Sequence, residues 1–199
     1  MSLSTFLSYL LLVLASVLLV LAIVVLYRSI RRYRGHMEVL AKALKGTTET
    51  ASTPFTRIFM LQGTHLGHRY LCSFKPPVRN APPEFTISFH GSFPEGLSIR
   101  KRIQDLKALK KPTAPEEIHT GDDTFDMLFV ARERKGRSEK AFLEEQARRD
   151  HITALLITEE ARMFFEGGSA RAILYGLDLQ EIVPEFLLES LDRLASLAR

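Results

Sequence analysis

The stretch FLSYLLLVLASVLLVLAIVVLYRSIRRYRG, residues 6–35, decides how the chain is organised. Its first 21 residues carry no charge, and only two serines and one tyrosine interrupt the apolar run. An α-helix of this length covers about 32 Å, and the hydrocarbon core of a bilayer is about 30 Å thick. Because a helix satisfies its own backbone hydrogen bonds in lipid, we predict a transmembrane anchor over residues 1–27.

A cleaved secretory signal is the main alternative for such an N-terminal segment. A signal peptide has a basic beginning, a short apolar core and small residues at its cleavage site. The segment MSLSTFLSY, residues 1–9, contains no Lys or Arg, and VVLYRS, residues 24–29, offers no small-residue pattern. The apolar run is also too long. We therefore predict that the anchor is not cleaved.

Four arginines follow the apolar run directly, with no acidic residue before or among them: Arg28, Arg31, Arg32 and Arg34. Basic residues beside a spanning helix are retained on the cytoplasmic side. The sequence thus predicts a single-pass protein of the inner (plasma) membrane, with its N-terminus outside and its C-terminal domain in the cytoplasm. We also expect these arginines to attract anionic lipids, by roughly 1 kcal/mol per residue near the surface.

The same arginines explain the net charge of the chain. The sequence has 27 Lys and Arg against 23 Asp and Glu, which gives a formal charge of +4. Because the four arginines supply this whole excess, residues 36–199 are neutral overall. We therefore expect no nucleic-acid partner, although the sequence pI is about 9.3.

Residues 28–45 are predicted to form a basic amphipathic helix next to the membrane. Apolar side chains recur there at heptad spacing from Leu26 to Leu44, with Gly35 as an interruption. Such a seam has two interpretations: the helix lies on the membrane surface, or residues 26–44 pair with a second copy in a homodimer. The following GTTETASTP, residues 46–54, changes to small polar residues between a Gly and a Pro, which predicts a linker.

Residues 55–199 are long enough for one domain with its own core. Period-two alternation and aromatic or β-branched content predict strands over residues 55–62, 68–74 and 84–91. In the second of these strands, Tyr70, Cys72 and Phe74 share one face, so we expect the single cysteine of the chain to pack in the core.

The second half of the domain mixes strands and helices. A strand is predicted over residues 125–134, and a helix capped by Ser138 that buries Leu143, Ala147 and Leu155. Two alternating runs meet at Gly167-Gly168 and predict a β-hairpin. A closing amphipathic helix follows, with Pro184 in its first turn and an apolar stripe of Val183, Leu187, Leu191, Leu194 and Ala198. The expected class is α+β: an N-terminal transmembrane helix, then an antiparallel sheet packed with two or more helices.

The segment EEIHTGDDTFDMLFV, residues 116–130, is the place where acids and a histidine gather. His119, Asp122 and Asp126 are the ligand candidates, as a metal site or an acid-base pair. The alternative is a structural turn in which Asp side chains accept hydrogen bonds from nearby backbone amides, and we favour it. The sequence lacks H-E-x-x-H, EF-hand, phosphate-loop and C-x-x-C patterns, so we predict no catalytic residue, cofactor or metal.

Other polar groups carry weaker signals. His65 and His68 flank a glycine at a hairpin tip, where a solvated loop is the simpler interpretation. The basic run at residues 100–111 and the proline-rich excursion at residues 75–83 are candidate contact surfaces for a membrane or a protein.

The segments TGDDTFDMLFVAR and ARMFFEGGSARAILYG, with the helix between them and the terminal helix, carry a resemblance. From residue 116 to the C-terminus the chain resembles the soluble domain of an uncharacterised family of bacterial single-pass membrane proteins with a cytosolic α+β domain. The segment ERKGRSEK, residues 133–140, departs from that pattern. The resemblance implies a tethered cytosolic domain and assigns no catalytic residue.

Two function classes follow from the sequence. The first, which we prefer, is a membrane-tethered cytosolic interaction module that binds a protein partner or the inner leaflet. The second is a membrane-anchored enzyme or small-ligand sensor that uses the His119, Asp122 and Asp126 region. Converging side chains in a concave pocket would favour the second class, and carboxylates that cap backbone amides would weaken it.

We predict that the full chain remains in the membrane pellet after extraction at alkaline pH, because the apolar segment spans the lipid. Mass spectrometry of the extracted protein should find residues 1–27 still attached. Recovery in the soluble fraction, or a chain trimmed near Tyr27, would contradict the anchor.

Overall fold

The computed structural model describes residues 3–52, 57–78, 81–105, 117–133 and 140–198. The chain divides into two compact units, Met1–His36 and Met37–Arg199. Helix α1 begins at Leu3 and ends at Leu44, so its first part forms the first unit and its last turns belong to the second.

Within the described residues, α1 is the one helix long and apolar enough to cross a membrane. Its side chains from Leu7 to Tyr27 are exposed, as expected of a segment that needs an apolar surrounding. The helix continues without a break through Gly35, since glycine lowers helix stability by only about 1 kcal/mol. The structure thus agrees with the predicted anchor in length and composition.

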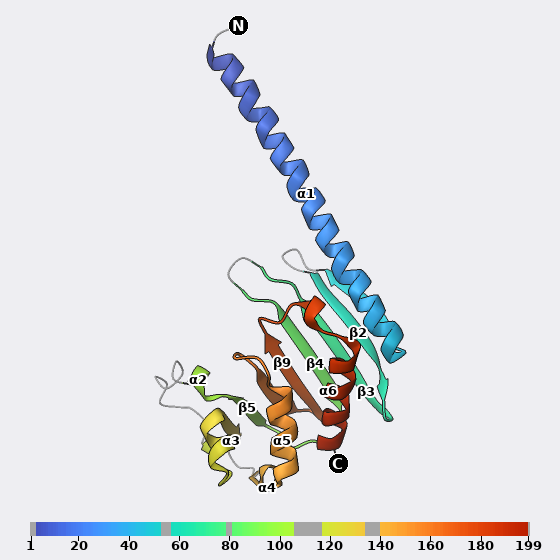
Figure 1. Ribbon diagram of the computed structural model, residues 1–199, viewed down its shortest axis with the longest axis vertical. Coiled ribbons are helices and arrows are strands. Elements are labelled where there is room, and N and C mark those ends of the chain that lie inside the picture. The colour runs from blue at the N-terminus through green and yellow to red at the C-terminus, as the bar shows by residue number, and fades with distance from the viewer. Residues whose placement is uncertain (1–2, 53–56, 79–80, 106–116, 134–139, 199) are drawn as a thin grey trace. The chain divides into compact units, whose positions relative to one another are not determined.

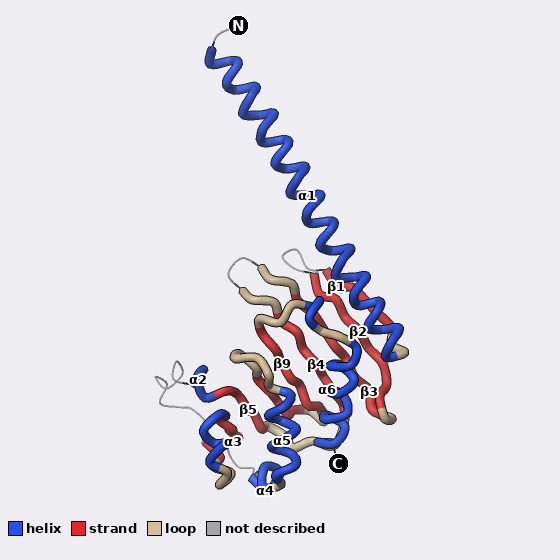
Figure 2. Tube along the Cα trace, in the orientation of Figure 1, coloured by secondary structure: helices blue, strands red, loops and turns tan. Residues whose placement is uncertain are grey.

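The second unit is built on one antiparallel sheet, in which the described residues supply nine strands (Figures 1 and 2). Their order across the sheet is β1-β2-β3-β4-β9-β8-β5-β7-β6. The strands are β1 (Thr47–Ser52), β2 (Arg57–His65), β3 (His68–Lys75), β4 (Glu84–His90), β5 (Leu97–Lys101), β6 (Glu117–Ile118), β7 (Phe129–Glu133), β8 (Arg162–Glu166) and β9 (Ser169–Tyr175). The hairpin β8-β9 lies between β4 and β5 at the centre of the sheet. These two strands follow each other in the sequence but are not paired.

Short helices accompany the sheet. They are α2 (Arg102–Asp105), α3 (Asp123–Leu128), α4 (Lys140–Glu144), α5 (Gln146–Leu155), the 3-10 turn η1 (Leu179–Glu181) and α6 (Pro184–Leu197). Helices α5 and α6 contact each other, and α6 packs against β2 and β4 (Figure 1). The strands and helices together form the predicted α+β class.

The core lies on the sheet face that α6 covers. One register row crosses eight strands and is buried at every position: Leu61, Cys72, Ile87, Ala172, Met163, Ile99, Ala131 and Ile118. Leu187, Leu191 and Leu194 of α6 are fully buried as well. Because side chains alternate between faces, the neighbours of these residues along each strand lie on the opposite face of the sheet.

The C-terminal end of α1 belongs to this core. Met37, Leu40, Ala41 and Leu44 are buried within the second unit. These residues include the second half of the seam for which we expected a membrane surface or a second copy of the chain. That half is therefore used inside the domain, whereas Leu26 remains exposed.

The predicted linker at residues 46–54 was wrong for most of its length. Thr47–Ser52 form β1, and all six residues pair with β2. Helix α1 ends at Leu44, the next residue, Lys45, has a positive φ of 53°, and the amide of Gly46 donates to the carbonyl oxygen of Ala41 at 2.8 Å. Polar residues on both faces resemble a loop in sequence, but they also suit an edge strand, and threonine favours extended backbone.

Two other predicted boundaries needed correction. The strand expected over residues 125–134 begins only at Phe129, because Asp123–Leu128 form α3. The helix expected after Ser138 is divided into α4 and α5 at Glu145, with Ala147 exposed and Ile152 buried instead. Ser138 itself lies outside the described residues.

The hairpin was predicted correctly, and so was the closing helix except for Val183, which precedes the helix as its N-cap residue and is 46% exposed. Gly167 and Gly168 connect β8 and β9 with φ of 59° and 68°, which side chains other than glycine adopt at a cost. Helix α6 begins at Pro184 and buries Leu187, Leu191 and Leu194. Cys72 is buried as expected, and burial raises the pKa of its thiol, so it is a packing residue.

Tyr70 and Gly63 approach each other closely between the strands β2 and β3. The two residues are register partners, and a Cβ atom on Gly63 would lie 2.5 Å from the Tyr70 hydroxyl and 2.8 Å from Cζ. Burial, followed by the charge of Cys72, raises the pKa of Tyr70 to about 12. Because Tyr70 is only 2% exposed, its ring has little room to move aside.

We therefore predict that Gly63→Ala destabilises the domain by about 1–3 kcal/mol, the usual cost of overpacking a core. Chemical unfolding of the purified full chain, followed by circular dichroism, would measure the change. The control is Gly35→Ala, where a Cβ atom meets nothing within 4 Å. An unchanged stability of Gly63→Ala would show that Tyr70 can shift away.

Candidate functional site

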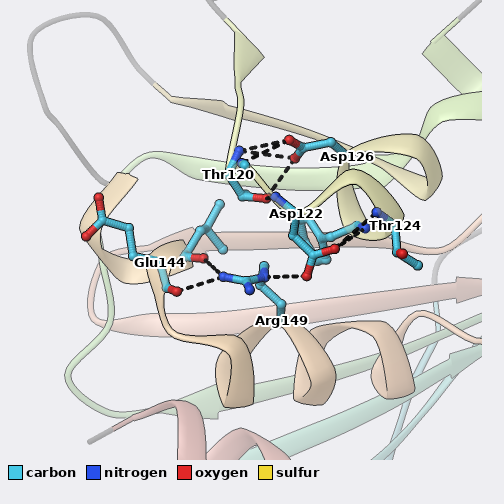
Figure 3. Close-up of polar contacts among 9 residues, drawn as sticks. Thr120, Asp122, Thr124, Asp126, Glu144 and Arg149 are labelled. Atoms are coloured by element: carbon cyan, nitrogen blue, oxygen red, sulfur yellow. Dashed lines mark hydrogen bonds and ion pairs between the residues drawn. The ribbon is translucent and has the colours of Figure 1, made fainter.

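The acidic turn that sequence reasoning selected forms the beginning of α3 (Figure 3). Asp122 is the N-cap residue, and its Oδ1 accepts hydrogen bonds from the amides of Thr124 and Phe125 at 3.1 Å each. Its Oδ2 lies 3.0 Å from Nε of Arg149. Both oxygens of this carboxylate are thus occupied by contacts within the chain.

Asp126, within α3, binds the two residues that precede Asp122 in the turn. Its carboxylate accepts hydrogen bonds from the amide of Thr120 at 3.1 Å, from the Thr120 hydroxyl at 2.9 Å and from the amide of Gly121 at 3.2 Å. Arg102 donates to the carbonyl oxygen of Asp126 and also pairs with Glu117. The carboxylate therefore fixes a turn, as an Asp in such a loop is expected to do.

Arg149 connects this turn to the neighbouring helices. Its Nη1 donates to the carbonyl oxygens of Leu143 and Glu144 at 2.7 Å, while Nε holds Asp122 (Figure 3). The side chain of Arg149 is only 12% exposed. The Arg149 guanidinium thus donates hydrogen bonds to carbonyl oxygens at the end of α4 and to the carboxylate that caps the start of α3.

The charge state of Asp122 follows from these contacts. The hydrogen bond from the amide of Phe125 lowers its pKa most, and Arg149 lowers it further. A carboxylate held ionised in this way is a poor proton donor at neutral pH. His119 is exposed, and the described residues contain no group of three or more His, Cys, Asp or Glu side chains able to hold a metal. Among the described residues, the contacts of Asp122 and Asp126 are thus with backbone groups, Thr120 and Arg149.

A different cluster lies on the sheet face opposite α6, and the sequence analysis missed it as a group. Arg100, Arg132 and Arg162 come from the adjacent strands β5, β7 and β8. Arg100 is the register partner of both Arg162 and Val130, and Arg132 follows Val130 by two residues on the same face. The three arginines line one cavity of about 240 Å³, together with Ser98, Ile99, Val130 and Phe164.

The three guanidinium groups that line this cavity lie close enough to affect one another's charge. Burial lowers the pKa of Arg100, and the nearby charges of Arg132 and Arg162 lower it further. The guanidinium carbon of Arg162 lies 5.6 Å from the ring centre of Tyr175, a cation-π contact. Val130, the register partner of Arg100, is only 1% exposed.

A second cavity of about 300 Å³ adjoins the first and shares Ser98, Arg132 and Phe164 with it. Its other lining residues include Glu133 and Glu166. Phe164, between the two cavities, is 37% exposed and is thus the large aromatic side chain that a ligand can reach there. The sequence signal for this site was the alternation of Arg with buried residues in three strands, but only the topology makes those strands adjacent.

The remaining polar groups have structural contacts. His65 lies 2.7 Å from a carboxylate oxygen of Asp192 on α6, and its side chain is 18% exposed, so it is not a solvated tip as we expected. Nδ1 of His68 lies 3.0 Å from the carbonyl oxygen of His90. Half of the basic run, residues 106–111, lies outside the described residues, as do residues 79–80 of the proline-rich excursion.

Comparison with known proteins adds no relative. No family model matches the chain, and no curated protein or solved structure was found to be similar to it. The resemblance drawn from residues 116–199 therefore gains no support from a family match, and the function has to be argued from the molecule itself.

We predict that Asp122→Ala lowers the melting temperature, whereas Asp123→Ala, an exposed neighbour without the cap contacts, changes it much less. The folded-state pKa of Asp122 lies below its unfolded value, so its contribution is present above about pH 4 and is lost as the pH falls through the folded-state pKa. The difference between wild type and Asp122→Ala should therefore narrow in acid. Thermal unfolding from pH 7 down to pH 3 would measure it, and a constant difference would contradict the assigned role of the charge.

Proposed function

We propose that this protein is a single-pass membrane protein whose α+β domain works in the cytoplasm as a binding module for a partner protein. The observation that carries the proposal is the pairing of a helix suited to crossing a membrane with a domain that follows it directly. Helix α1 runs from the apolar segment to Leu44, and its last residues lie in the core of the second unit, so such an anchor would tether the domain.

The orientation rests on the arginines at the end of the apolar segment. Arg28, Arg31, Arg32 and Arg34 lie within α1, and basic residues at this position favour retention of the following domain in the cytoplasm. The same side chains suit contact with anionic lipid headgroups of the inner leaflet. A homodimer through residues 26–44 would have to rely on the first half of the seam, because Met37, Leu40 and Leu44 are buried.

The proposed contact with a partner is the edge strand β1. It forms one end of the sheet, and its backbone groups on the outer side have no neighbouring strand among the described residues. Thr47, Glu49, Thr50 and Ser52 are exposed, and the strand contains neither Lys nor Pro, the residues that commonly protect an edge. An extended segment of a partner protein can add to such an edge through main-chain hydrogen bonds.

Binding is a better conclusion than catalysis at the acidic turn. Asp122 and Asp126 are both occupied by backbone amides, and His119 is exposed. This arrangement supports the structural interpretation of the turn and offers no support for the enzyme or sensor that we considered for this region.

The orientation can be tested by thiol labelling in intact cells. Cys72 is buried, so introduced cysteines are the accessible thiols. A membrane-impermeant maleimide should label Ser2→Cys from outside and should label Glu160→Cys, in an exposed turn, only after lysis. Labelling of Glu160→Cys in intact cells would contradict the proposed topology.

The edge can be tested by photo-crosslinking in native membranes. A photoreactive amino acid in place of Thr50 on β1 should capture a partner protein, whereas the same group in place of Thr153, exposed on α5, should not. Glu49→Pro, which disturbs the edge, should abolish the adduct. Equal capture at both sites, or capture of a second copy of the chain alone, would contradict a distinct partner at β1.

A further inference from the structure

We propose that a cavity lined by Lys45, Arg69 and His90 binds the phosphate group of a phosphorylated polyol. It lies on the open face of the sheet, by which we mean the face opposite α6. The ligand class is a small molecule that carries several hydroxyl groups and a phosphate monoester, and glucose 6-phosphate is an example. This inference goes beyond the proposed function and does not depend on it.

The cavity has a volume of about 580 Å³ and is larger than the two cavities described above. Two register rows supply much of its lining: Thr47, Gln62 and Leu71 in one, and Thr64 and Arg69 in the other. Both rows alternate along the strands with buried core positions, so these side chains stand on the open face. The volume is within the range of roughly 300–1,000 Å³ that is usual for small-molecule sites.

Cationic side chains reach the cavity from three elements. On β3 and β4, Arg69 and His90 lie opposite each other, one position beyond a register pair of the two strands. Lys45, the residue that follows α1, also lines the cavity. Among the described residues, no acidic side chain lines it. The lining therefore favours an anionic group.

The charges of Arg69 and Lys45 are available to a ligand. Both residues are exposed, and neither forms an ion pair with another residue that the structure describes. Because Lys45 follows the end of α1, where carbonyl groups carry partial negative charge, we expect it to contribute less than Arg69. The planar guanidinium of Arg69 can donate two hydrogen bonds at once to the oxygens of a phosphate.

Neutral polar groups surround these charges. Thr47, Thr64 and Gln62 line the cavity, and each can both donate and accept hydrogen bonds. Leu71 is the one apolar side chain of the open face among the described lining residues. The hydroxyl groups of a polyol can pair with these polar side chains, whereas an apolar ligand would leave them without partners. The surroundings therefore favour a polyol as the part of the ligand that carries the phosphate.

The floor of the cavity is held in place from the core side. Gly46 and Gly63 line the cavity, and Tyr70, which is 2% exposed, packs against both of them. A Cβ atom on Gly46 would lie 2.9 Å from the Tyr70 hydroxyl. A ligand need not order a backbone that is packed in this way, which lowers the entropic cost of binding.

The test measures ligand binding to the full chain in nanodiscs of neutral phosphatidylcholine, by isothermal titration calorimetry. The probes are glucose 6-phosphate, inorganic phosphate and glucose. Glucose 6-phosphate should bind more tightly than either of the other two, because only it uses both the cationic and the neutral polar side chains. Absence of saturable binding of both phosphate probes at millimolar concentration would overturn the proposal. Equal affinities for inorganic phosphate and glucose 6-phosphate would overturn the assignment of a polyol.

Substitutions assign the binding to the cavity. Arg69→Gln should weaken glucose 6-phosphate by about tenfold or more, since it removes a charged hydrogen-bond donor, and Lys45→Gln should have a smaller effect. Gln62→Ala should weaken glucose 6-phosphate and leave inorganic phosphate unchanged. The control is Arg171→Gln, because Arg171 is an exposed arginine on β9 that does not line the cavity. Equal effects of Arg171→Gln and Arg69→Gln would overturn the site.

Two further measurements keep the result interpretable. Melting temperatures show whether a variant is folded, and Arg69→Lys, which keeps the charge but loses the fork, should bind more weakly than wild type and better than Arg69→Gln. Nanodiscs that contain phosphatidylglycerol distinguish the source of the phosphorylated polyol. Undiminished affinity for glucose 6-phosphate supports a soluble ligand, and competition by the lipid supports the same cavity with a headgroup as its occupant. Neither outcome depends on the orientation of α1 or on capture at β1, so failure here and failure of the proposed function can be told apart.

Discussion

The domain depends on the burial of one face of its antiparallel sheet. A single register row supplies buried side chains from eight strands, and α6 covers that face with three leucines. A fully buried Leu, Ile or Met contributes about 1.5–3 kcal/mol relative to an exposed one, so this row is a large share of the stability. The end of α1 joins the same core through Met37, Leu40 and Leu44, which makes a helix that is apolar enough for lipid also a part of the folded domain.

The alternation that buries one face also determines what the other face can carry. Ile99, Ala131 and Met163 point to the core, and their neighbours Arg100, Arg132 and Arg162 therefore stand on the opposite side. The closeness of these arginines is a consequence of strand order, since β5 lies between β8 and β7. At the acidic turn, by contrast, charge is used for local structure: Arg149 holds the start of α3 to the end of α4, and the carboxylates satisfy backbone amides.

The differences between expectation and structure have physical causes. Residues 47–52 have the polar composition of a linker, yet a strand at the edge of a sheet also meets water on both sides, and pairing with β2 decides between the two. The strand expected from Phe125 starts at Phe129, because Asp122 caps a short helix first and local capping outweighs the apolar pattern. The local sequence pattern predicted that Asp122 and Asp126 accept hydrogen bonds from backbone amides, as they do. It could not predict that Arg100, Arg132 and Arg162 lie on adjacent strands, because those strands come from distant parts of the chain.

The sequence by itself determined the features that depend on neighbouring residues: the apolar helix with its basic end, the glycine turn between β8 and β9, the stripe of α6 and the buried position of Cys72. Each follows from period, turn chemistry or capping within a few residues. The tertiary structure alone decided that β1 completes the sheet, that the end of α1 lies in the core and that the arginines of three strands meet over one cavity. These results depend on pairings between residues far apart in the chain, and no local pattern specifies which strands become neighbours.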